Sequence, residues 1–406
     1  MKDLYKFKIS APGTICLYGD PILGYERPSI VAALKERINL EFSSLPRKVN
    51  KGYIRLAFTD LKLSLNISLY ALFKHFRCFR MQNVNHRFHY TLINNVNRFL
   101  GSLNINNGIY DPGNKAQHLS LKAFLYLFVF VTYKENIEMT ATINMKISSD
   151  LEMGKGLGSS AAFVTCLAAC FWHWSLLQKG IVRKFNDDDF QKIDYYAWSC
   201  EKIIYNGQCK SNIYGSIHGT IIMLKNSHVC IMDSIPPMHI LLIDTNINQE
   251  KKTVQMEEMH HLCPCTDFIV ISIESMFPQL FAILLAICKI YVDLRESNIE
   301  WNIQFAKLDS YYKNLLSFIN RNQSLLKALG LSNQNINLIC AIAQKYLCGC
   351  KMICTSGYVF ILPLLDNYHT STITTPRHMD QLKQELKSYH FSVNHTYISC
   401  KGLAID

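Results

Sequence analysis

The sequence has no apolar run long enough to cross a membrane. Its longest runs, Ala123 to Val131 and Leu280 to Cys288, fall well short of the roughly 20 residues that a span requires. We therefore expect buried helices and no membrane partner. No secretory signal opens the chain, and its 15 cysteines are odd in number and irregularly spaced. Together these features predict reduced thiols and a cytoplasmic protein.

A recognisable RNA- or DNA-binding motif is also missing. Lysine and arginine total 42 against 31 acidic residues, which gives a net charge of +11. Such a charge suits an anionic ligand such as a polyphosphate. Because the basic residues are scattered, a solvated basic surface explains the charge more simply. We expect no nucleic-acid partner.

Metal-binding patterns are few and weak. His260, His261, Cys263 and Cys265 lie close together, but adjacent ligands without a distant second pair rarely build a tetrahedral zinc site. The acidic run Asp187 to Asp189 is better explained as a solvated helix start than as a metal site. A loop and a helix cap are the simpler interpretations of these two segments.

Apolar periodicity predicts an α+β chain that divides near Pro236 and Pro237, into residues 1–235 and 236–406. Residues 45–117 carry no usable motif and are expected to form peripheral strands and loops. The predicted helices are Leu119–Tyr133, Ala161–Leu177 and Asp194–Tyr205, and the predicted strands are Lys6–Ile9, Ile15–Tyr18, Met139–Ile147, Thr220–Leu224, Ile240–Ile243 and the region Lys351–Leu365.

Three glycines alternate with other residues directly before one of these helices, in the segment Gly154-Lys155-Gly156-Leu157-Gly158-Ser159-Ser160-Ala161-Ala162. Glycine allows positive φ, so that successive backbone N–H groups can point at one anion, and the helix N-terminus adds its own donors. Ser159 and Ser160 could cap the helix or offer a hydroxyl to a phosphate-bound Mg²⁺. Neither the Walker A pattern nor the G-x-G-x-x-G fingerprint is present. The glycines alone support a nucleotide loop and a plain capped turn equally.

The loop resembles the second motif of the GHMP kinases (galactokinase, homoserine kinase, mevalonate kinase, phosphomevalonate kinase), which reads proline-x-G-x-G-L-G-S-S-A. The run GLGSSA stands intact at Gly156 to Ala161, with Glu152 in place of the proline and Lys155 as an additional cation. The segment Lys8 to Asp20 resembles the first motif, A-P-G-K-x-x-L-x-G-E-H. Thr14 stands in place of its lysine and Asp20 in place of its glutamate.

The second half of the chain resembles the mevalonate kinases in particular. Asn322 to Ser332 is similar to their stretch N-Q-x-x-L-x-x-L-G-V-S. Leu241 to Thr253 is similar to their T-x-x-x-R-x-T segment, with Thr245, Lys252 and Thr253 in register. The third motif, K-L-T-G-A-G-G-G-G, retains only Lys351 and Gly357.

This resemblance implies a two-domain GHMP kinase fold, with an N-terminal ribosomal-protein-S5-like domain, a C-terminal ferredoxin-like α/β sandwich and the active site between them. It implies ATP on the loop Gly154 to Ala161, and Mg²⁺ on Ser160 and Glu201. Glu201 lies in a segment similar to the family helix whose glutamate coordinates the metal. Mevalonate would be the substrate and 5-phosphomevalonate the product, in isoprenoid and sterol biosynthesis, with a homodimer possible.

Two catalytic positions differ from the family. The motif lysine near the transferred phosphate corresponds to Thr14, and the catalytic aspartate corresponds to Asn212. An amide orients a hydroxyl but does not take its proton. Two hypotheses follow: a kinase in which Lys155, Lys210 or Asp20 compensates, or a relative that binds ligands and catalyses little. A kinase for a related small alcohol is a third.

Overall fold

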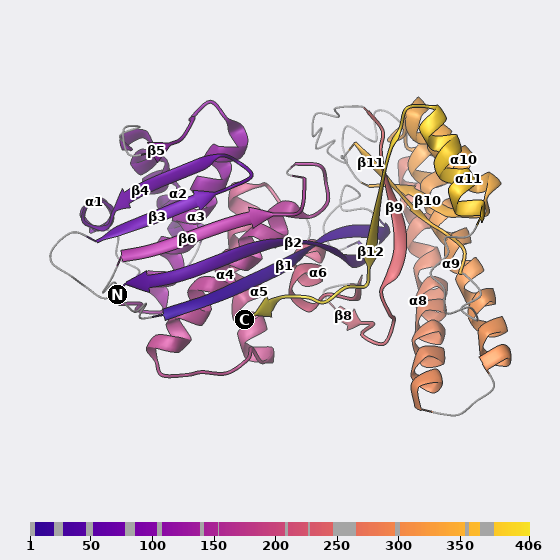
Figure 1. Ribbon diagram of the computed structural model, residues 1–406, viewed down its shortest axis with the longest axis horizontal. Helices are drawn as coiled ribbons and strands as arrows, with labels where there is room; N and C mark the ends of the chain where they lie inside the picture. Colours follow the sequence, from indigo (N-terminus) through magenta and orange to yellow (C-terminus); the bar gives the residue numbers. More distant parts are fainter. Residues whose placement is uncertain are drawn as a thin grey trace.

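The computed structural model describes residues 5–19, 27–45, 52–77, 86–103, 108–138, 142–152, 154–207, 210–225, 228–246, 265–296, 301–353, 357–365 and 377–406. These residues form an α+β fold with a sheet of 13 strands that extends through both halves of the chain (Figure 1). The expected fold class is confirmed.

The N-terminal half is built on a sheet with one apolar and one polar face. Residues alternate between buried and exposed along the strands, as in Lys6, Phe7, Lys8 and Ile9, because successive side chains point to opposite faces. Only the β3–β6 pair is parallel among the strand pairs described here. The strands are β1 (Tyr5–Tyr18), β2 (Ser29–Leu45), β3 (Tyr53–Phe58), β4 (Leu63–Ser68), β5 (Gly108–Ile109), β6 (Thr142–Ser149), β7 (Ile221–Lys225), β8 (His228–Ile231) and β13 (Ala404–Ile405).

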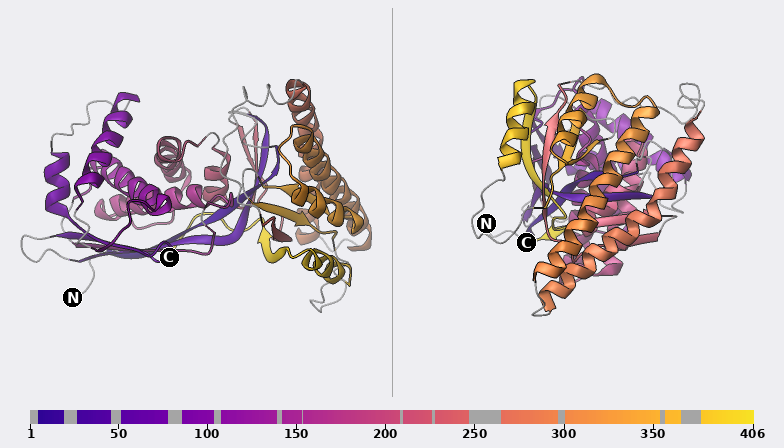
Figure 2. Two further views of the ribbon diagram at one scale, coloured as in Figure 1. Left: turned by 90° about the horizontal axis from the view of Figure 1, so that it is seen from above. Right: turned by 90° about the vertical axis from the view of Figure 1, so that its right-hand side faces the viewer.

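Helices cover the apolar face of this sheet, which Figure 2 shows from its edge. They are α1 (Leu69–Phe76), α2 (His86–Ser102), α3 (Lys115–Lys134), α4 (Ser159–Gln178), α5 (Asp187–Ile204) and α6 (Ser211–His218). Helix α4 is apolar on all sides and is the central core helix, with the ring of Trp174 packed 5.1 Å from that of Phe42. The three helices expected in this half are confirmed.

Residues 45–117 were expected to be peripheral strands and loops, and that expectation holds only in part, since β4 and β5 form the edge of the sheet. The segment contains α1 and α2, and β3 lies inside the sheet between β6 and β4. Helix α2 is polar overall but buries Phe88, Leu92, Val96 and Phe99. Their spacing of four, four and three is the signal of an amphipathic helix.

Helix α5 begins with the acidic run Asp187 to Asp189, which caps the helix as expected. Asn186 and Asp189 form a reciprocal capping box. Asp189 is not solvated, however. It is buried, accepts a hydrogen bond from the indole N–H of Trp172 at 2.9 Å and pairs with Arg183. The run therefore has a structural role, as the simpler interpretation holds.

The C-terminal half packs long helices against a smaller set of strands. In sheet order the strands are β10 (Gly349–Met352), β11 (Tyr358–Leu362), β9 (Met238–Asp244) and β12 (Ser392–Ile398), and the helices are α8 (Thr266–Glu296), α9 (Trp301–Ala328), α10 (Gln334–Lys345) and α11 (Arg377–Ser388). The strand expected at Ile240–Ile243 and the strand character of Lys351–Leu365 are confirmed.

Two strand pairs join the halves. Leu34 of β2 pairs with Ile398 of β12, and Ile405 near the end of the chain pairs with Ile9 of β1. The predicted division at Pro236 and Pro237 falls directly before β9 and stays a prediction. These two pairs hold the strands of the second half against the sheet of the first.

Helix α8 differs from the buried helix expected at Leu280–Cys288. Leu280, Leu284 and Ile287 are buried, but Leu285 is 43% exposed, so only one face is covered. No uninterrupted apolar run reaches the length of a span, but by overall hydropathy two described segments, α4 and the Thr266–Leu294 part of α8, are long and apolar enough to cross a membrane. Helix α4 is almost entirely enclosed by the protein, as a core helix would be.

Candidate functional site

The glycine loop packs directly against β1. The backbone N–H of Thr14 donates to the carbonyl of Leu157 at 3.0 Å. Gly154, Gly156 and Gly158 have φ of 80°, 75° and 68°, a region that glycine adopts without strain. A Cβ on Gly158 would lie 2.2 Å from Oγ1 of Thr14. Only glycine therefore lets the loop reach β1 and turn into α4.

The N-terminus of α4 has no side-chain cap. Its N-cap is Gly158, so of the two roles left open for Ser159 and Ser160 capping does not apply; both lie inside the first turn. The first N–H groups of a helix have no partner within the helix, and the helix dipole places positive charge there. Glycine has no side chain to satisfy them. The end of α4 is thus suited to an anionic oxygen.

Helix α5 places Glu201 opposite this turn. Oγ of Ser160 donates to Oε1 of Glu201 at 2.8 Å, and Glu201 is only 9% exposed. A Cβ on Gly207 would lie 2.7 Å from Cγ of Glu201, so glycine also makes room for this carboxylate. Hydroxyl and carboxylate oxygens are the ligands that Mg²⁺ prefers. The donor set of the two predicted metal ligands therefore fits Mg²⁺.

Helix α6 brings the two predicted catalytic residues together. Oγ1 of Thr14 donates to Oδ1 of Asn212 at 3.1 Å, and Thr14 is 1% exposed. Oγ of Ser216 donates to the carbonyl of Pro12 at 2.9 Å, which fixes α6 on β1. The contact joins residues 198 apart in sequence. It is a neutral pair, which orients a hydroxyl but provides no carboxylate base.

Lys210 precedes α6 and forms an ion pair with Asp194, which the sequence did not indicate as a site residue. Its Nζ lies 3.2 Å from Oδ2 of Asp194 and above the rings of Trp198 and Tyr214. Burial raises the pKa of Asp194, while the charge of Lys210 opposes that shift. Asp194 lies seven residues before Glu201, on the same face of α5. The spacing of seven residues from Glu201 is the sequence signal that could have predicted a place for Asp194 near the site.

Lys351, the retained lysine of the third motif, is fully buried and connects β10 to β1. Its Nζ donates to the carbonyls of Cys16 and Met352, at 3.2 Å each. At the unpaired edge of β10, helix α9 supplies a hydrogen-bond acceptor. Oε1 of Gln323 accepts from the N–H of Met352 at 2.8 Å. Oδ1 of Asn320 likewise accepts from the N–H of Cys350 at 2.8 Å. The side-chain amides of Asn320 and Gln323 thus take the place of a neighbouring strand.

Several predicted residues lie outside the described part of the chain, namely Asp20, Lys252, Thr253, His260, His261 and Cys263. Cys265 is exposed. Gly357 accepts from the N–H of Thr245 at 2.7 Å, which places the two beside each other. Among the described residues, no group of three or more histidine, cysteine or acidic side chains is arranged to hold a metal ion.

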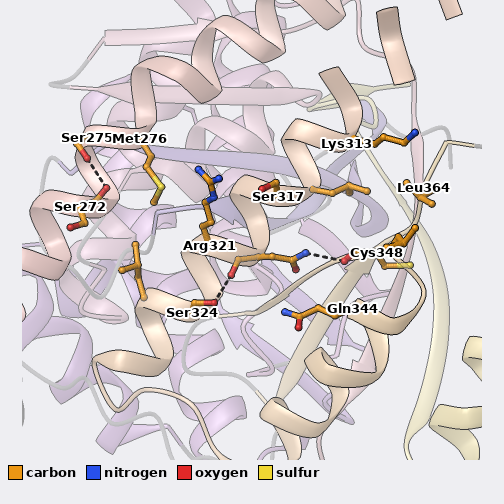
Figure 3. Close-up of a pocket in the computed structure, with 14 residues that line it drawn as sticks. Ser272, Ser275, Met276, Lys313, Ser317, Arg321, Ser324, Gln344, Cys348 and Leu364 are labelled. Atoms are coloured by element: carbon orange, nitrogen blue, oxygen red, sulfur yellow. Dashed lines mark hydrogen bonds between the residues drawn. The ribbon is translucent and has the colours of Figure 1, made fainter. Parts of the chain in front are cut away.

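A cavity of about 760 Å³ lies elsewhere, between α8, α9 and the end of α10 (Figure 3). Three of its lining serines are engaged within their own helices: Ser272 donates to the carbonyl of Phe268, Ser275 to that of Ser272 and Ser324 to that of Asn320. None of the predicted site residues lines it. It is separate from the loop and its surroundings.

The family model and the curated relatives that the chain matches agree with each other. Residues 122–219, which contain the loop, Glu201 and Asn212, match the model described as the GHMP kinases N terminal domain. The chain is 25% identical to the mevalonate kinase of Mus musculus over 234 residues, 56% of this chain and 55% of that protein. It is 22% identical to the mevalonate kinase of Homo sapiens over 405 residues, 98% of this chain and 94% of that protein.

The chain thus spans about half the length of the mouse protein in that match. Among solved structures, the mevalonate kinase of Methanococcus jannaschii superimposes with a TM-score of 0.62. That likeness covers 97% of this chain and 98% of the other, at 17% sequence identity. At such identity it establishes the fold.

Proposed function

Because the chain is a divergent member of the GHMP kinases with mevalonate kinases among its relatives, we propose that it transfers the γ-phosphate of ATP to the primary hydroxyl of mevalonate. The observation that carries the proposal is the uncapped N-terminus of α4 beside the Ser160–Glu201 pair. Backbone donors for phosphate and oxygen ligands for Mg²⁺ adjoin there. The proposal includes a cytoplasmic role in isoprenoid and sterol synthesis, and a homodimer stays a prediction.

The roles follow from what each group can donate or accept. The backbone N–H groups of the loop and of the first turn of α4 would hold the phosphate oxygens. Ser160 and Glu201 would hold Mg²⁺, which offsets the charge of the phosphates when it is bound. Asn212, fixed by Thr14, would orient the attacking hydroxyl. Phosphoryl transfer depends mainly on positioning and charge stabilisation, so such a site retains a rate without a formal base.

A second candidate function is a ligand-binding protein with the same fold and little turnover. The specific observation in its favour is the neutral Thr14–Asn212 contact. It occupies both positions at which the family resemblance implies charged groups. Losing a general base costs about 10²- to 10⁴-fold in rate.

The experiment is an assay of the purified chain with ATP, Mg²⁺ and mevalonate. ADP release is followed by a coupled assay, and 5-phosphomevalonate is identified by mass spectrometry. We expect Mg²⁺-dependent product, and a loss of about 10²-fold or more in turnover for Glu201→Gln, since metal charge stabilisation contributes several kcal/mol. The matched control is Glu138→Gln, an exposed position.

Three other outcomes decide between the hypotheses. ATP binding without any product favours the ligand-binding protein. Product from another small alcohol but not from mevalonate favours a related kinase. Equal turnover in Glu201→Gln and in the unaltered chain contradicts the assignment of Glu201 as a metal ligand.

A further inference from the structure

Two residues at the glycine loop contact strands of the C-terminal half. The hydroxyl of Tyr358 donates to Oε1 of Glu152 at 2.9 Å. Nζ of Lys155 lies 3.6 Å from Oδ2 of Asp244 and 5.6 Å from the centre of the Tyr358 ring. Asp244 ends β9, Tyr358 begins β11, and the two are paired directly in the sheet. We call these four residues the loop bridge.

Within the loop bridge, Lys155 is held loosely. The 3.6 Å separation from Asp244 exceeds the 2.7–2.9 Å typical of a charge-assisted hydrogen bond. The side chain of Lys155 is 31% exposed, so its ammonium remains accessible to solvent. The other oxygen of Asp244 accepts from the N–H of Asn246 at 2.8 Å, which fixes this carboxylate at the strand end. Lys155 can therefore leave without disturbing the strand.

The site lacks a cation where the family resemblance implies one, because Thr14 is neutral. Lys155 belongs to the loop itself, three residues before the N-cap of α4. A bound triphosphate with about four negative charges attracts an ammonium more strongly than a single carboxylate does. We infer that Lys155 supplies the missing cation: it exchanges Asp244 for the phosphate oxygens of the bound nucleotide. This inference rests on the proposed ATP site.

The remaining pair of the loop bridge explains how an acid is accommodated beside that site. Glu152 is engaged by the hydroxyl of Tyr358. Burial, together with the charges of Glu152 and Asp244, raises the pKa of Tyr358, so the phenol stays protonated and continues to donate. The carboxylate of Glu152 is thus held by a strand of the C-terminal half and is not available to repel a phosphate. Lys155 is the member of the loop bridge that is available to a phosphate.

The test measures ATP affinity by isothermal titration calorimetry in the presence of Mg²⁺, for the full chain and single variants. Lys155→Met should weaken ATP binding about tenfold or more, the loss of a hydrogen bond to a charged group. Lys155→Arg should restore most of that loss. Asp244→Asn should tighten ATP binding about two- to fivefold, because the competing partner of a partly exposed ion pair is neutralised. Lys146→Met, on the polar sheet face, is the matched control.

The opposite changes in ATP affinity expected for Lys155→Met and Asp244→Asn distinguish phosphate binding by Lys155 from a structural role. If the Lys155–Asp244 pair only held the halves together, both variants would weaken binding and lower the melting temperature alike. That result, or unchanged affinity in Lys155→Met, overturns the inference. If the unaltered chain binds ATP with the predicted signs but forms no phosphomevalonate, the proposed reaction fails while the role of Lys155 stands. If it binds no ATP, both are overturned.

Discussion

The contact between Thr14 and Asn212 makes the sharpest prediction about catalysis. Replacing both residues, as Thr14→Lys with Asn212→Asp, would introduce the two charges that the family resemblance implies. Asn212 is partly exposed at the start of α6, so a carboxylate there remains hydrated and still accepts from Thr14. We expect Asn212→Asp alone to raise turnover by about 10²- to 10⁴-fold, the usual contribution of a positioned base.

Thr14→Lys alone should behave differently. Thr14 is 1% exposed, and added Cβ atoms on Gly158 or Gly215 would come within 2.2 Å and 2.7 Å of its side chain. The longer side chain is crowded by the loop and by α6, and we expect it to extend toward Asn212, which Thr14 already contacts. An ammonium buried there without a carboxylate should lower the free energy of unfolding by about 3–5 kcal/mol. The double variant should recover about 2 kcal/mol of this loss through the new ion pair.

The assay is a double-mutant cycle on turnover and on thermal unfolding, with Asn66→Asp, an exposed position on β4, as the control for added charge. Strictly additive effects in both measurements would refute the reasoning, because the two side chains are then not coupled. So would a fall in turnover for Asn212→Asp. Either result would move the proton acceptor to another carboxylate.

Two further predictions concern the loop and the core. Gly158→Ala should abolish ATP binding and destabilise the fold by more than 1 kcal/mol, because its Cβ clashes with Thr14; Gly180→Ala has a similar positive φ but open space, and calorimetry should show ATP affinity unchanged there. Burial lowers the pKa of His173 to about 4, so the unfolded chain takes up its proton first as pH falls from 6.5. Stability should decrease by about 3 kcal/mol toward pH 4, and urea unfolding of His173→Phe should lack that component; an identical pH profile would contradict it.

Much of the fold follows from local patterns in the sequence. The alternation at the start of β1 and the uniformly apolar α4 predict a strand and a buried helix, because residue spacing sets which faces are buried. The two strands expected at Lys6–Ile9 and Ile15–Tyr18 nevertheless form one continuous strand. Helix α2 was missed because its apolar residues are diluted by asparagine, arginine and histidine. The sequence left a serine cap of α4 as one of two alternatives, and the structure places Gly158, with its positive φ, at the N-cap instead.

The site divides in the same way. The sequence by itself determined the glycine loop, since GLGSSA combines glycine freedom with a helix start. Through the family resemblance it also predicted site roles for Thr14, Glu201 and Asn212. Only the tertiary structure placed Thr14 on Asn212 and Lys155 beside Asp244. Those contacts span β1, α6 and the end of β9, and the packing of two halves fixes them. Sequence spacing specifies neighbours along a helix or strand, but it carries no distance between separate elements.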